Sequence, residues 1–600
     1  MSQTYGRHRG SSSDRVGNVA AAIIALAALG GVGVVAVQGR AGSGTGDGRG
    51  ATAGVQGPTG SRQVEVRTCD DATTLYASPD LTDALARVAD DYRVAQRSAC
   101  ARVAVQQAAG PAALPGLLSS DRAALWLARS EGDVAALPSS VRRTAPQLVA
   151  STPVVLAMPS AMADTGAWGW PTRPLTPDAW RSWMLGRSTW AQTGHPEWAS
   201  FSIRMADPAT SPTAAIGFGA MITLANGGPL AKAPDYAEPS DKDLAVIKVE
   251  HRITSLAGND GDVLPDQDDT LSEVTSRASA YVTTERAVAA HNAVDPTVPL
   301  AAVPLAGGAA SVPLSVLGVG ATADDAPGAA SARGFRAYLT SASGLAALRA
   351  AGLRAPDGAA PTDHPAGVAY AAAPLRPAAV PLPVLQQTVQ AWRGMHSRIS
   401  SMVLVDASGS MNQHLAGGAT SRIDLVRGLV GNVYQTASPR ARSGVWFFHT
   451  SNELGTPLIE RATDLAVNES ADAGRQHSDV VVQAMSDVTI KGGTPLYQAV
   501  REAYAYTLDE YDPGYVNQLV VLSDGANRDT TSPDTLGQLL TYLNEAKDPQ
   551  RPVRIICLGY GAEADMGALQ AIASATGGRA AQVNSPSEMK AAVNLALFSL

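Results

Sequence analysis

The segment Met402-Val-Leu-Val-Asp-Ala-Ser-Gly-Ser-Met411 organises the C-terminal third of this chain. Its apolar run, residues 402–405, predicts a buried strand. The strand leads into Asp406, Ser408 and Ser410 on a loop that contains glycine. Hard divalent cations take oxygen ligands, and side chains at alternate positions of a loop can face one point. The segment therefore predicts a strand that carries oxygen ligands at its carboxyl end.

Two later segments add ligands of the same kind. Lys491-Gly-Gly-Thr-Pro-Leu-Tyr497 predicts a loop that enters a helix and carries Thr494. Gln518-Leu-Val-Val-Leu522 predicts a buried strand followed by Ser523 and Asp524. In an open α/β sheet, sites form outside the carboxyl ends of the strands. We therefore expect Asp406, Ser408, Ser410, Thr494 and Asp524 to share one site, with waters completing the coordination of a cation.

Residues 384–600 resemble a von Willebrand factor type A domain with a complete metal-ion-dependent adhesion site. Asp406, Ser408 and Ser410 match the D-x-S-x-S element of that family, Thr494 in GGTP its threonine, and Asp524 in LSDG its second aspartate. The resemblance implies a Rossmann-like doubly wound fold and a bound Mg²⁺, Mn²⁺ or Ca²⁺. It also implies an open coordination position for an Asp or Glu carboxylate of a partner protein. Two aspartates leave a divalent cation formally neutral, so an incoming carboxylate is attracted.

The region 64–355 alternates strand-like and helix-like segments, which predicts a parallel α/β sheet. It resembles a two-lobed extracytoplasmic solute-binding protein. The resemblance rests on LYASPDLTDALARVADDY, STPVVLAMPS, GWPTRPLTPDAW, RMADPATSPTAAIGFGAM and FRAYLTSASGLAALRAAGLRAP. A ligand would then lie between the lobes at helix N-termini, where backbone N–H groups favour anions. Ser78 in the first lobe, with Thr210 and Ser211 in the second, are the candidates.

The alternative for these three residues is helix capping, which Ser and Thr favour for local reasons. Capping is the preferred interpretation because no arginine is matched to a ligand carboxylate or phosphate. The acidic run that contains Asp260, Asp262, Asp266 and Asp269 lacks the spacing of a calcium loop, so it is expected to be a solvated turn. A cluster of tryptophans between Trp168 and Trp198 is expected to pack the lobe rather than to bind a ligand.

The N-terminus predicts a membrane anchor. Arg7, His8 and Arg9 precede a span at 18–38 that contains the run VAAAIIALAALGG from Val19, and roughly 20 apolar residues can cross a bilayer as a helix. Basic residues cluster before the span, so residues 1–17 are expected in the cytoplasm and the rest outside it. A cleaved signal peptide is the rival interpretation. A disulfide between Cys69 and Cys100 would suit that compartment, with two buried thiols as the alternative.

Linkers separate these parts. The Gly-rich run 39–63 predicts a flexible tether, and the Pro/Ala-rich run 356–383 predicts a stiffer connection to the C-terminal domain. The chain of 600 residues carries a net charge of −8, which gives no basic footprint for nucleic acid.

The sequence predicts a binding protein rather than an enzyme. In this hypothesis a membrane-anchored extracytoplasmic protein holds a partner protein through the divalent-metal site. The alternative is a solute receptor that binds a small ligand between the lobes and relays the event to the C-terminal domain. A hydrolase is disfavoured because no motif supplies a nucleophile or a base.

Overall fold

The computed structural model describes residues 72–585 and 588, except 98–100, 174, 229–233, 235–238, 306–309, 322–325, 363–366, 369–379, 397, 415–418, 452–455, 473–474, 525–526 and 528–533. The predicted anchor at 18–38, the tether, Cys69 and Cys100 lie outside these residues. By its contacts the chain divides into Met1–Arg67 and Thr68–Leu600, so every described residue belongs to the second unit. No helix in this described part is long and apolar enough to cross a membrane.

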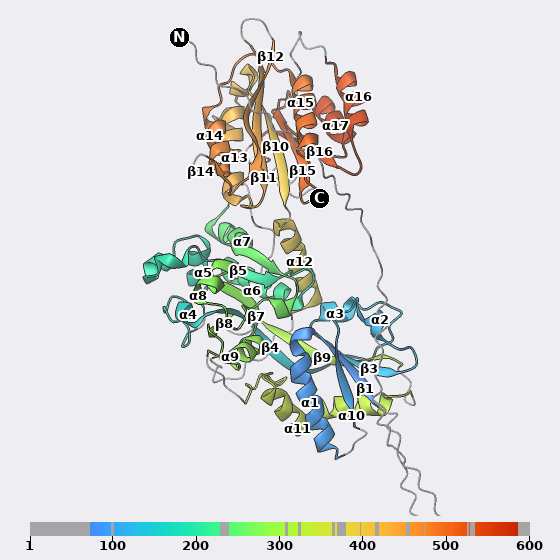
Figure 1. Ribbon diagram of the computed structural model, residues 1–600. Coiled ribbons are helices and arrows are strands. Elements are labelled where there is room, and N and C mark those ends of the chain that lie inside the picture. The colour runs from blue at the N-terminus through green and yellow to red at the C-terminus, as the bar shows by residue number, and fades with distance from the viewer. Residues whose placement is uncertain are drawn as a thin grey trace, which may run out of the picture. The chain divides into compact units, whose positions relative to one another are not determined.

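The N-terminal region is a two-lobed α/β structure joined by a long shared strand, β4 (Gln147–Pro159), as Figure 1 shows. The sheet order is β2-β1-β3-β9-β4-β7-β5-β6, and β8 pairs with β4. The first lobe contains β1 (Thr73–Ala77), β2 (Val103–Gln107), β3 (Ala123–Ala128), β9 (Ser311–Gly320), α1 (Thr82–Ala95), α2 (Leu114–Leu117), α3 (Glu131–Ala135), α10 (Ala329–Leu339) and α11 (Ala342–Ala350). The second contains β5 (Ile203–Ala206), β6 (Ile253–Ala257), β7 (Ala280–Thr284), β8 (Leu300–Pro304), α4 (Ser160–Ala163), α5 (Pro177–Met184), α6 (Pro212–Asn226), α7 (Asp241–Arg252), α8 (Leu271–Arg277) and α9 (Glu285–Asn292).

The sheet of this region is mixed, and the expectation of a parallel sheet was wrong in part. β9 runs antiparallel to β3 and β4, and β7 and β8 run antiparallel to β4. The pairs β1–β2, β1–β3, β5–β6 and β5–β7 are parallel, as predicted. The alternation of strands and helices predicts the parallel pairs within each lobe. It does not predict the direction of β4 and β9, the strands that pass between the lobes.

The tryptophan cluster forms part of the core, which confirms the packing interpretation. Trp168 and Trp183 stack with ring centroids 4.9 Å apart, and Phe201 lies 5.0 Å from Trp168. Trp180 and Trp190 are fully buried. The four indoles, of Trp168, Trp180, Trp183 and Trp190, are at most 2% exposed. They pack the core of the second lobe, and none of them presents a face to a ligand.

Helix α12 (Leu382–His396) connects the two regions. The sequence assigned its residues from 384 onward to the C-terminal domain, whereas its packing contacts are with α6, α3 and α7 of the N-terminal region. Trp392 is 2% exposed and packs edge-on against Phe218 of α6 at 5.1 Å. The apolar face of α12 is therefore covered by the N-terminal region.

The C-terminal domain is a doubly wound sheet, as the sequence predicted. Its strand order is β12-β11-β10-β15-β16-β17, with all neighbours parallel except the antiparallel edge pair β11–β12. The strands are β10 (Ile399–Asp406), β11 (Arg442–Thr450), β12 (Pro457–Val467), β15 (Val516–Ser523), β16 (Val553–Tyr560) and β17 (Ala580–Val583). A short ribbon pairs β13 (Ala471–Asp472) with β14 (Arg475–Gln476).

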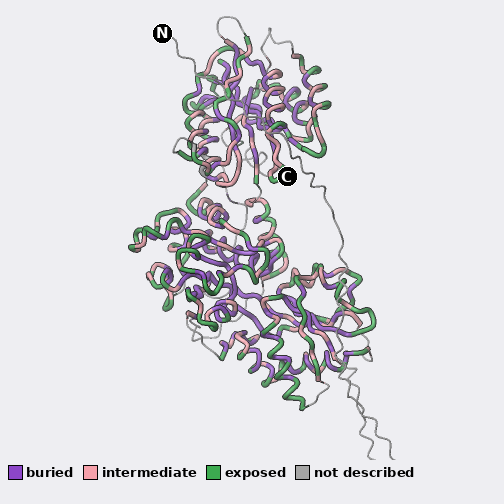
Figure 2. Tube along the Cα trace, viewed as in Figure 1, coloured by how far each residue is buried: buried purple, intermediate pink, exposed green. Residues whose placement is uncertain are grey.

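Helices cover both faces of this sheet. Figure 1 shows α13 (Arg422–Thr436) and α14 (His477–Asp487) on one side, with α15 (Leu496–Asp509), α16 (Leu536–Ala546) and α17 (Met566–Ala575) on the other. Alternate residues of β10 feed the two faces, because Met402 and Leu404 pack into one core and Val405 into the other. Figure 2 shows the buried residues concentrated along the strands.

The order of the strands creates a crevice. From β10 the chain proceeds to β11 on one side, and β15 lies on the other side of β10. The carboxyl ends of β10 and β15 therefore flank the point where the strand order reverses, which is where open α/β sheets bind ligands.

Candidate metal centre

Asp406 ends β10 and is fully buried at this crevice. Its Oδ1 accepts a hydrogen bond from the backbone N–H of Ser408 at 2.9 Å, and its Oδ2 accepts one from the Ser523 hydroxyl at 2.6 Å. The hydroxyls of Ser408 and Ser410 lie 2.9 Å apart. The loop thus gathers a carboxylate and two hydroxyls at one strand end.

The segment that carries Thr494 is docked on this loop through its backbone. Gly409 N–H donates to Gly492 O at 3.0 Å, and Lys491 N–H donates to Ala407 O at 2.9 Å. Gly492 has φ +71°, and a Cβ there would lie 2.0 Å from Thr450 O, so the position requires glycine. Thr494 follows two residues later and is 1% exposed.

Asp524 follows β15 and faces the same crevice. Its Oδ2 accepts a hydrogen bond from Arg422 Nη1 at 3.1 Å, whereas its Oδ1 is buried without a hydrogen-bond partner. Arg422 is the first residue of α13, and it is almost fully buried. The sequence does not point to this arginine, because it lies 102 residues from Asp524 and belongs to no ligand motif.

The charges at the site favour a cation. Burial, and then the like charge of Asp524, raise the pKa of Asp406 to about 6. An added cation would offset both effects, and the orphaned Asp524 Oδ1 offers it an oxygen. Within the described residues no three His, Cys, Asp or Glu side chains group closely enough to hold a metal ion. The five predicted ligands contain two carboxylates and three hydroxyls, so this donor set fits a hard cation such as Mg²⁺ without such a group.

The candidate ligand residues between the lobes have local partners. Ser211 caps α6 by accepting from Ala214 N–H at 3.0 Å, and its hydroxyl donates to Asp260. The Ser78 hydroxyl donates to Asp80, and the Thr210 hydroxyl donates to Asp207 O at 3.3 Å. Ser211 therefore serves as a cap, as the sequence predicted, while Ser78 makes no side-chain capping bond to the helix it precedes.

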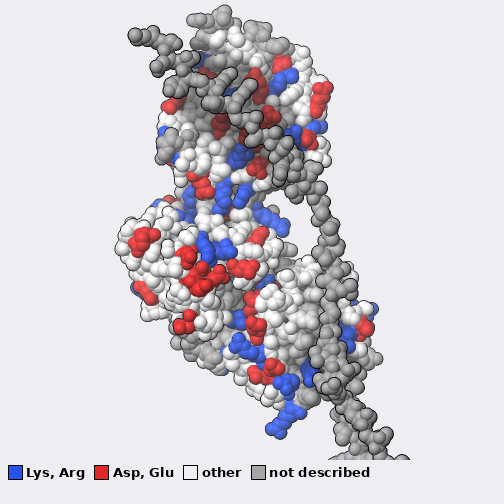
Figure 3. Space-filling model, viewed as in Figure 1, with Lys and Arg blue, Asp and Glu red and all other residues white. Residues whose placement is uncertain are grey.

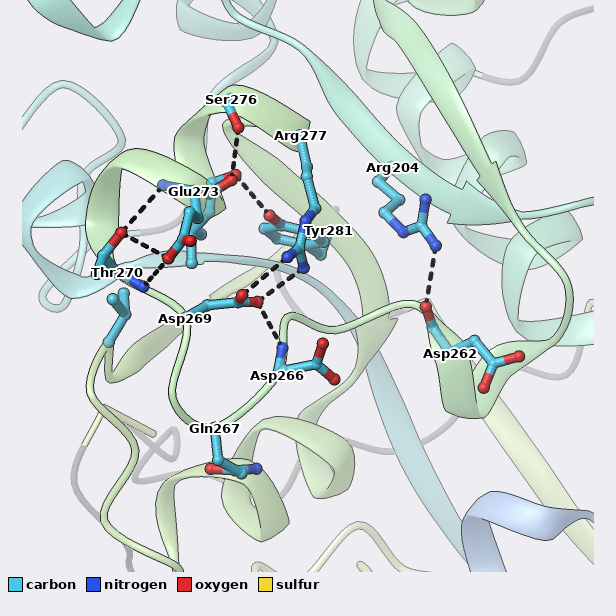
Figure 4. Close-up of polar contacts among 12 residues, drawn as sticks. Arg204, Asp262, Asp266, Gln267, Asp269, Thr270, Glu273, Ser276, Arg277 and Tyr281 are labelled. Carbon is cyan, nitrogen blue, oxygen red and sulfur yellow. Dashed lines mark hydrogen bonds and ion pairs between the residues drawn. The ribbon is translucent and has the colours of Figure 1, made fainter.

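The acidic segment is not a uniformly solvated turn, so that expectation was wrong for two of its members. Asp269 is 9% exposed. Its Oδ2 and Oδ1 accept hydrogen bonds from Arg277 Nη1 at 2.7 Å and Nη2 at 2.8 Å, and Figure 4 shows this pair. Asp260 is also largely buried and pairs with Arg129 of the other lobe. Asp262 is exposed, and in Figure 4 its carboxylate points away from Asp266 and Asp269. The sequence could not reveal the Arg129–Asp260 pair because the two residues are 131 positions apart.

Comparisons with known proteins identify both regions. Residues 73–354 match the family described as bacterial extracellular solute-binding protein, and residues 463–582 match the von Willebrand factor type A domain family. The second match includes Thr494 and Asp524 and begins after Asp406, Ser408 and Ser410. Two proteins described as uncharacterized, from two strains of Mycobacterium tuberculosis, are 22% identical over 209 residues. That stretch covers 33% of this chain and 28% of the length of those relatives.

Solved structures with similarity include representatives of both kinds. A von Willebrand factor type A protein from Catenulispora acidiphila has 17% identity and a TM-score of 0.26, over 34% of this chain and 42% of that one. Manganese-loaded TRAP protein of Plasmodium vivax has 20% identity and a TM-score of 0.25, over 33% and 72%. The periplasmic molybdate-binding protein of Azotobacter vinelandii has 13% identity and a TM-score of 0.28, over 47% and 99%. The two family matches identify a bacterial extracellular solute-binding domain at 73–354 and a von Willebrand factor type A domain at 463–582 in this chain.

Proposed function

We propose that this protein binds a partner protein through a divalent cation held at the carboxyl ends of β10 and β15. The observation that carries the proposal is the buried oxygen cluster with an orphaned Asp524 Oδ1 beside Asp406. The proposed ligands are Asp406, Ser408, Ser410, Thr494 and Asp524. A bound Mg²⁺ or Mn²⁺ would supply a Lewis-acidic position for an oxygen of the partner.

The surrounding charge suggests which oxygen the partner offers. Two aspartates balance a divalent cation, and the Arg422 guanidinium then adds a positive charge beside Asp524. Glu563, whose side chain is 71% exposed, lies 4.0 Å from Arg422 Nη2 and offsets part of that charge through solvent. The buried guanidinium would still make the loaded site more attractive to an Asp or Glu carboxylate than the ligands alone would. Figure 3 shows Lys and Arg interspersed with Asp and Glu over the viewed face, without the extended basic patch on that face that would favour nucleic acid.

We propose further that the protein acts outside the cytoplasm, anchored by the span at 18–38, and that it is not an enzyme. Its N-terminal family match is to extracellular solute-binding proteins, which supports the location. Both matched families are typically non-enzymatic, which supports a binding role.

The metal site can be tested before the partner is known. Isothermal titration of the metal-free protein with Mn²⁺ should show one site, and Asp406→Ala should lose it. Asp548→Ala is the matched control, because Asp548 is a partly exposed turn residue before the amino end of β16, whereas the proposed ligands lie at the carboxyl ends of the strands. Unchanged Mn²⁺ affinity in Asp406→Ala would overturn the metal assignment.

The partner step has its own readout. Proteins retained by the immobilised wild-type protein in Mg²⁺ should be released by EDTA, and Asp406→Ala should not retain them. If Mn²⁺ binds at this site but the same proteins stay bound in EDTA, the cation is structural and the proposed mode of partner binding fails.

One observation favours the second candidate, a solute receptor that signals to the C-terminal domain. Helix α12 contacts both lobes, since Leu382 N–H donates to Glu131 at 3.2 Å and Trp392 Nε1 donates to Asp207 at 2.9 Å. It then leads into β10, whose last residue is Asp406. Thermal shifts with a panel of oxyanions and amino acids would support this candidate if a solute stabilises the protein and Mg²⁺ does not.

A further inference from the structure

The boundary between the two lobes contains a buried ion pair. Arg129 follows β3 in the first lobe, and its guanidinium Nη1 pairs with Oδ2 of Asp260 from the second lobe. The two side chains are 9% and 11% exposed. Removing one member of such a pair leaves an uncompensated buried charge, so the loss of either side chain is expected to weaken the contact between the lobes.

The second oxygen of Asp260 is also occupied. Its Oδ1 accepts a hydrogen bond from the hydroxyl of Ser211, the N-cap of the 15-residue helix α6. One carboxylate therefore receives an arginine from one lobe and a hydroxyl at a helix N-terminus from the other. These are the donors that proteins use for a bound oxyanion, and here the anion belongs to the chain.

The charges nearby leave little room for a second anion. Asp80 Oδ1 lies 3.9 Å from Arg129 Nη1, and Asp133 Oδ2 accepts from the backbone N–H of Arg129 at 3.0 Å. Arg129 thus already faces three carboxylates. With Asp260 in place, an external oxyanion would be a fourth anionic group beside one guanidinium, whereas an anion that replaces the Asp260 carboxylate restores the existing balance of charge.

The chain also covers this boundary on one side. A pocket of about 850 Å³ is lined by Ser211 and Asp133, and by Leu385, Val389 and Arg393 of α12. A second pocket of about 790 Å³ is lined by Asp80, Asp260 and Arg286. Ser211 lines the first pocket and Asp260 lines the second. The hydrogen bond between these two residues therefore joins the walls of the two pockets.

We propose that Asp260 is a built-in ligand of the solute-binding domain: its carboxylate occupies an oxyanion site made by Arg129 and Ser211 and holds the lobes together without a solute. The site would accept a small carboxylate or sulfate only when the Asp260 carboxylate is absent or displaced. This inference is independent of the metal site proposed for the other domain.

Chemical rescue tests it. The whole protein carrying Asp260→Ala should melt several degrees below the wild type in chloride, and acetate or sulfate at equal ionic strength should restore the melting temperature saturably. The wild type should respond to acetate and chloride alike. Asp262→Ala is the matched control, since this exposed residue of the same turn should leave both melting temperature and anion response unchanged.

Each other outcome counts against the proposal. If acetate raised the melting temperature of the wild type as much as that of Asp260→Ala, Asp260 would not fill the site. If neither acetate nor sulfate raised the melting temperature of Asp260→Ala, there would be no such site. Should Asp260→Ala fail to fold, Asp260→Ser removes the charge, keeps a small polar group and still leaves room for an anion. That variant must show the same saturable rescue, and adding Arg129→Met must abolish it.

Discussion

Arg422 and Asp260 show what single residues add to the two sites. Each lies outside the motifs that the sequence offers, and each pairs with a group more than 100 residues away in the chain. Arg422 adds positive charge to a site that the ligands alone would leave neutral when loaded. Asp260 adds a carboxylate where the family resemblance leads us to expect a solute. In both cases one charged side chain changes what the site should attract.

His251 of α7 gives a prediction at the same scale. Burial, and then the cationic neighbours Lys248, Arg440 and Arg252, hold the pKa of His251 well below its usual value. A group whose pKa is depressed on folding stays neutral in the folded state but binds a proton in the unfolded state below about pH 6.5. Above about pH 6.5 the imidazole is neutral in both states, so it does not affect the free energy of unfolding. As the pH falls below that value, protonation of the unfolded state lowers the free energy of unfolding.

We expect acidification from pH 7.5 to 5 to cost about 1–2 kcal/mol through this residue, at about 1.4 kcal/mol per pH unit below the unfolded pKa. Urea denaturation at each pH would measure it. His251→Gln should flatten this part of the profile, while the exposed His195→Gln should leave it unchanged. Parallel profiles for wild type and His251→Gln would refute the assignment.

Among the elements, the loop before α15 depends on one backbone conformation. Gly492 has φ +71°, and its carbonyl accepts from Gly409 N–H at the metal loop. A side chain there would meet Thr450 O and displace the segment that carries Thr494.

Gly492→Ala is expected to destabilise the protein by about 1–3 kcal/mol and to weaken Mn²⁺ binding more than tenfold. Calorimetric titration and denaturation would measure the two effects. Gly428→Ala, in α13 with open space at its Cβ, should instead be neutral or stabilise by about 0.5–1 kcal/mol. Equal Mn²⁺ affinity in the wild type and Gly492→Ala would remove Thr494 from the proposed ligands.

Helix α12 should depend on Trp392 for its attachment to the solute-binding domain. The indole is buried against Phe218 and donates to Asp207, so Trp392→Ala is expected to cost about 3–5 kcal/mol. Val384→Ala, on the same helix and 47% exposed, should change stability by less than about 0.5 kcal/mol. Hydrogen exchange of residues 382–396 should rise in the first variant and not in the second. Protection that survives in Trp392→Ala would mean that other contacts hold the helix.

For the whole molecule, separate cores predict separable responses to ligands. Two clusters form the core of the solute-binding domain, and two others lie on the two faces of the C-terminal sheet, one of which also includes Ile247 of α7. Scanning calorimetry should resolve two transitions, one for each domain. Mg²⁺ at 100 times its Kd should stabilise the C-terminal domain by about 2.7 kcal/mol and raise the temperature of its transition. Asp260→Ala should lower the other. If Mg²⁺ moved both transitions equally, the contacts through α7 and α12 would couple the domains into one unit.

The local pattern of the sequence was enough for the individual strands of the C-terminal domain and for the strand ends that carry Asp406 and Asp524, whereas the doubly wound sheet was expected from the family resemblance. Apolar runs of strand length, each followed by polar loop residues, specify these elements through contacts between near neighbours. The same pattern predicted the capping role of Ser211 and the packing of the tryptophans.

Tertiary structure alone decided the antiparallel returns of β4 and β9, the attachment of α12 to the solute-binding domain, and the pairings of Arg422 and Asp260. Strand direction, helix docking and buried ion pairs depend on which distant surfaces meet. Periodicity describes the face that an element presents, but it does not specify the surface that covers that face. For this protein, the sequence therefore determined the proposed ligands of the metal site, and the tertiary structure decided the charges that surround both sites.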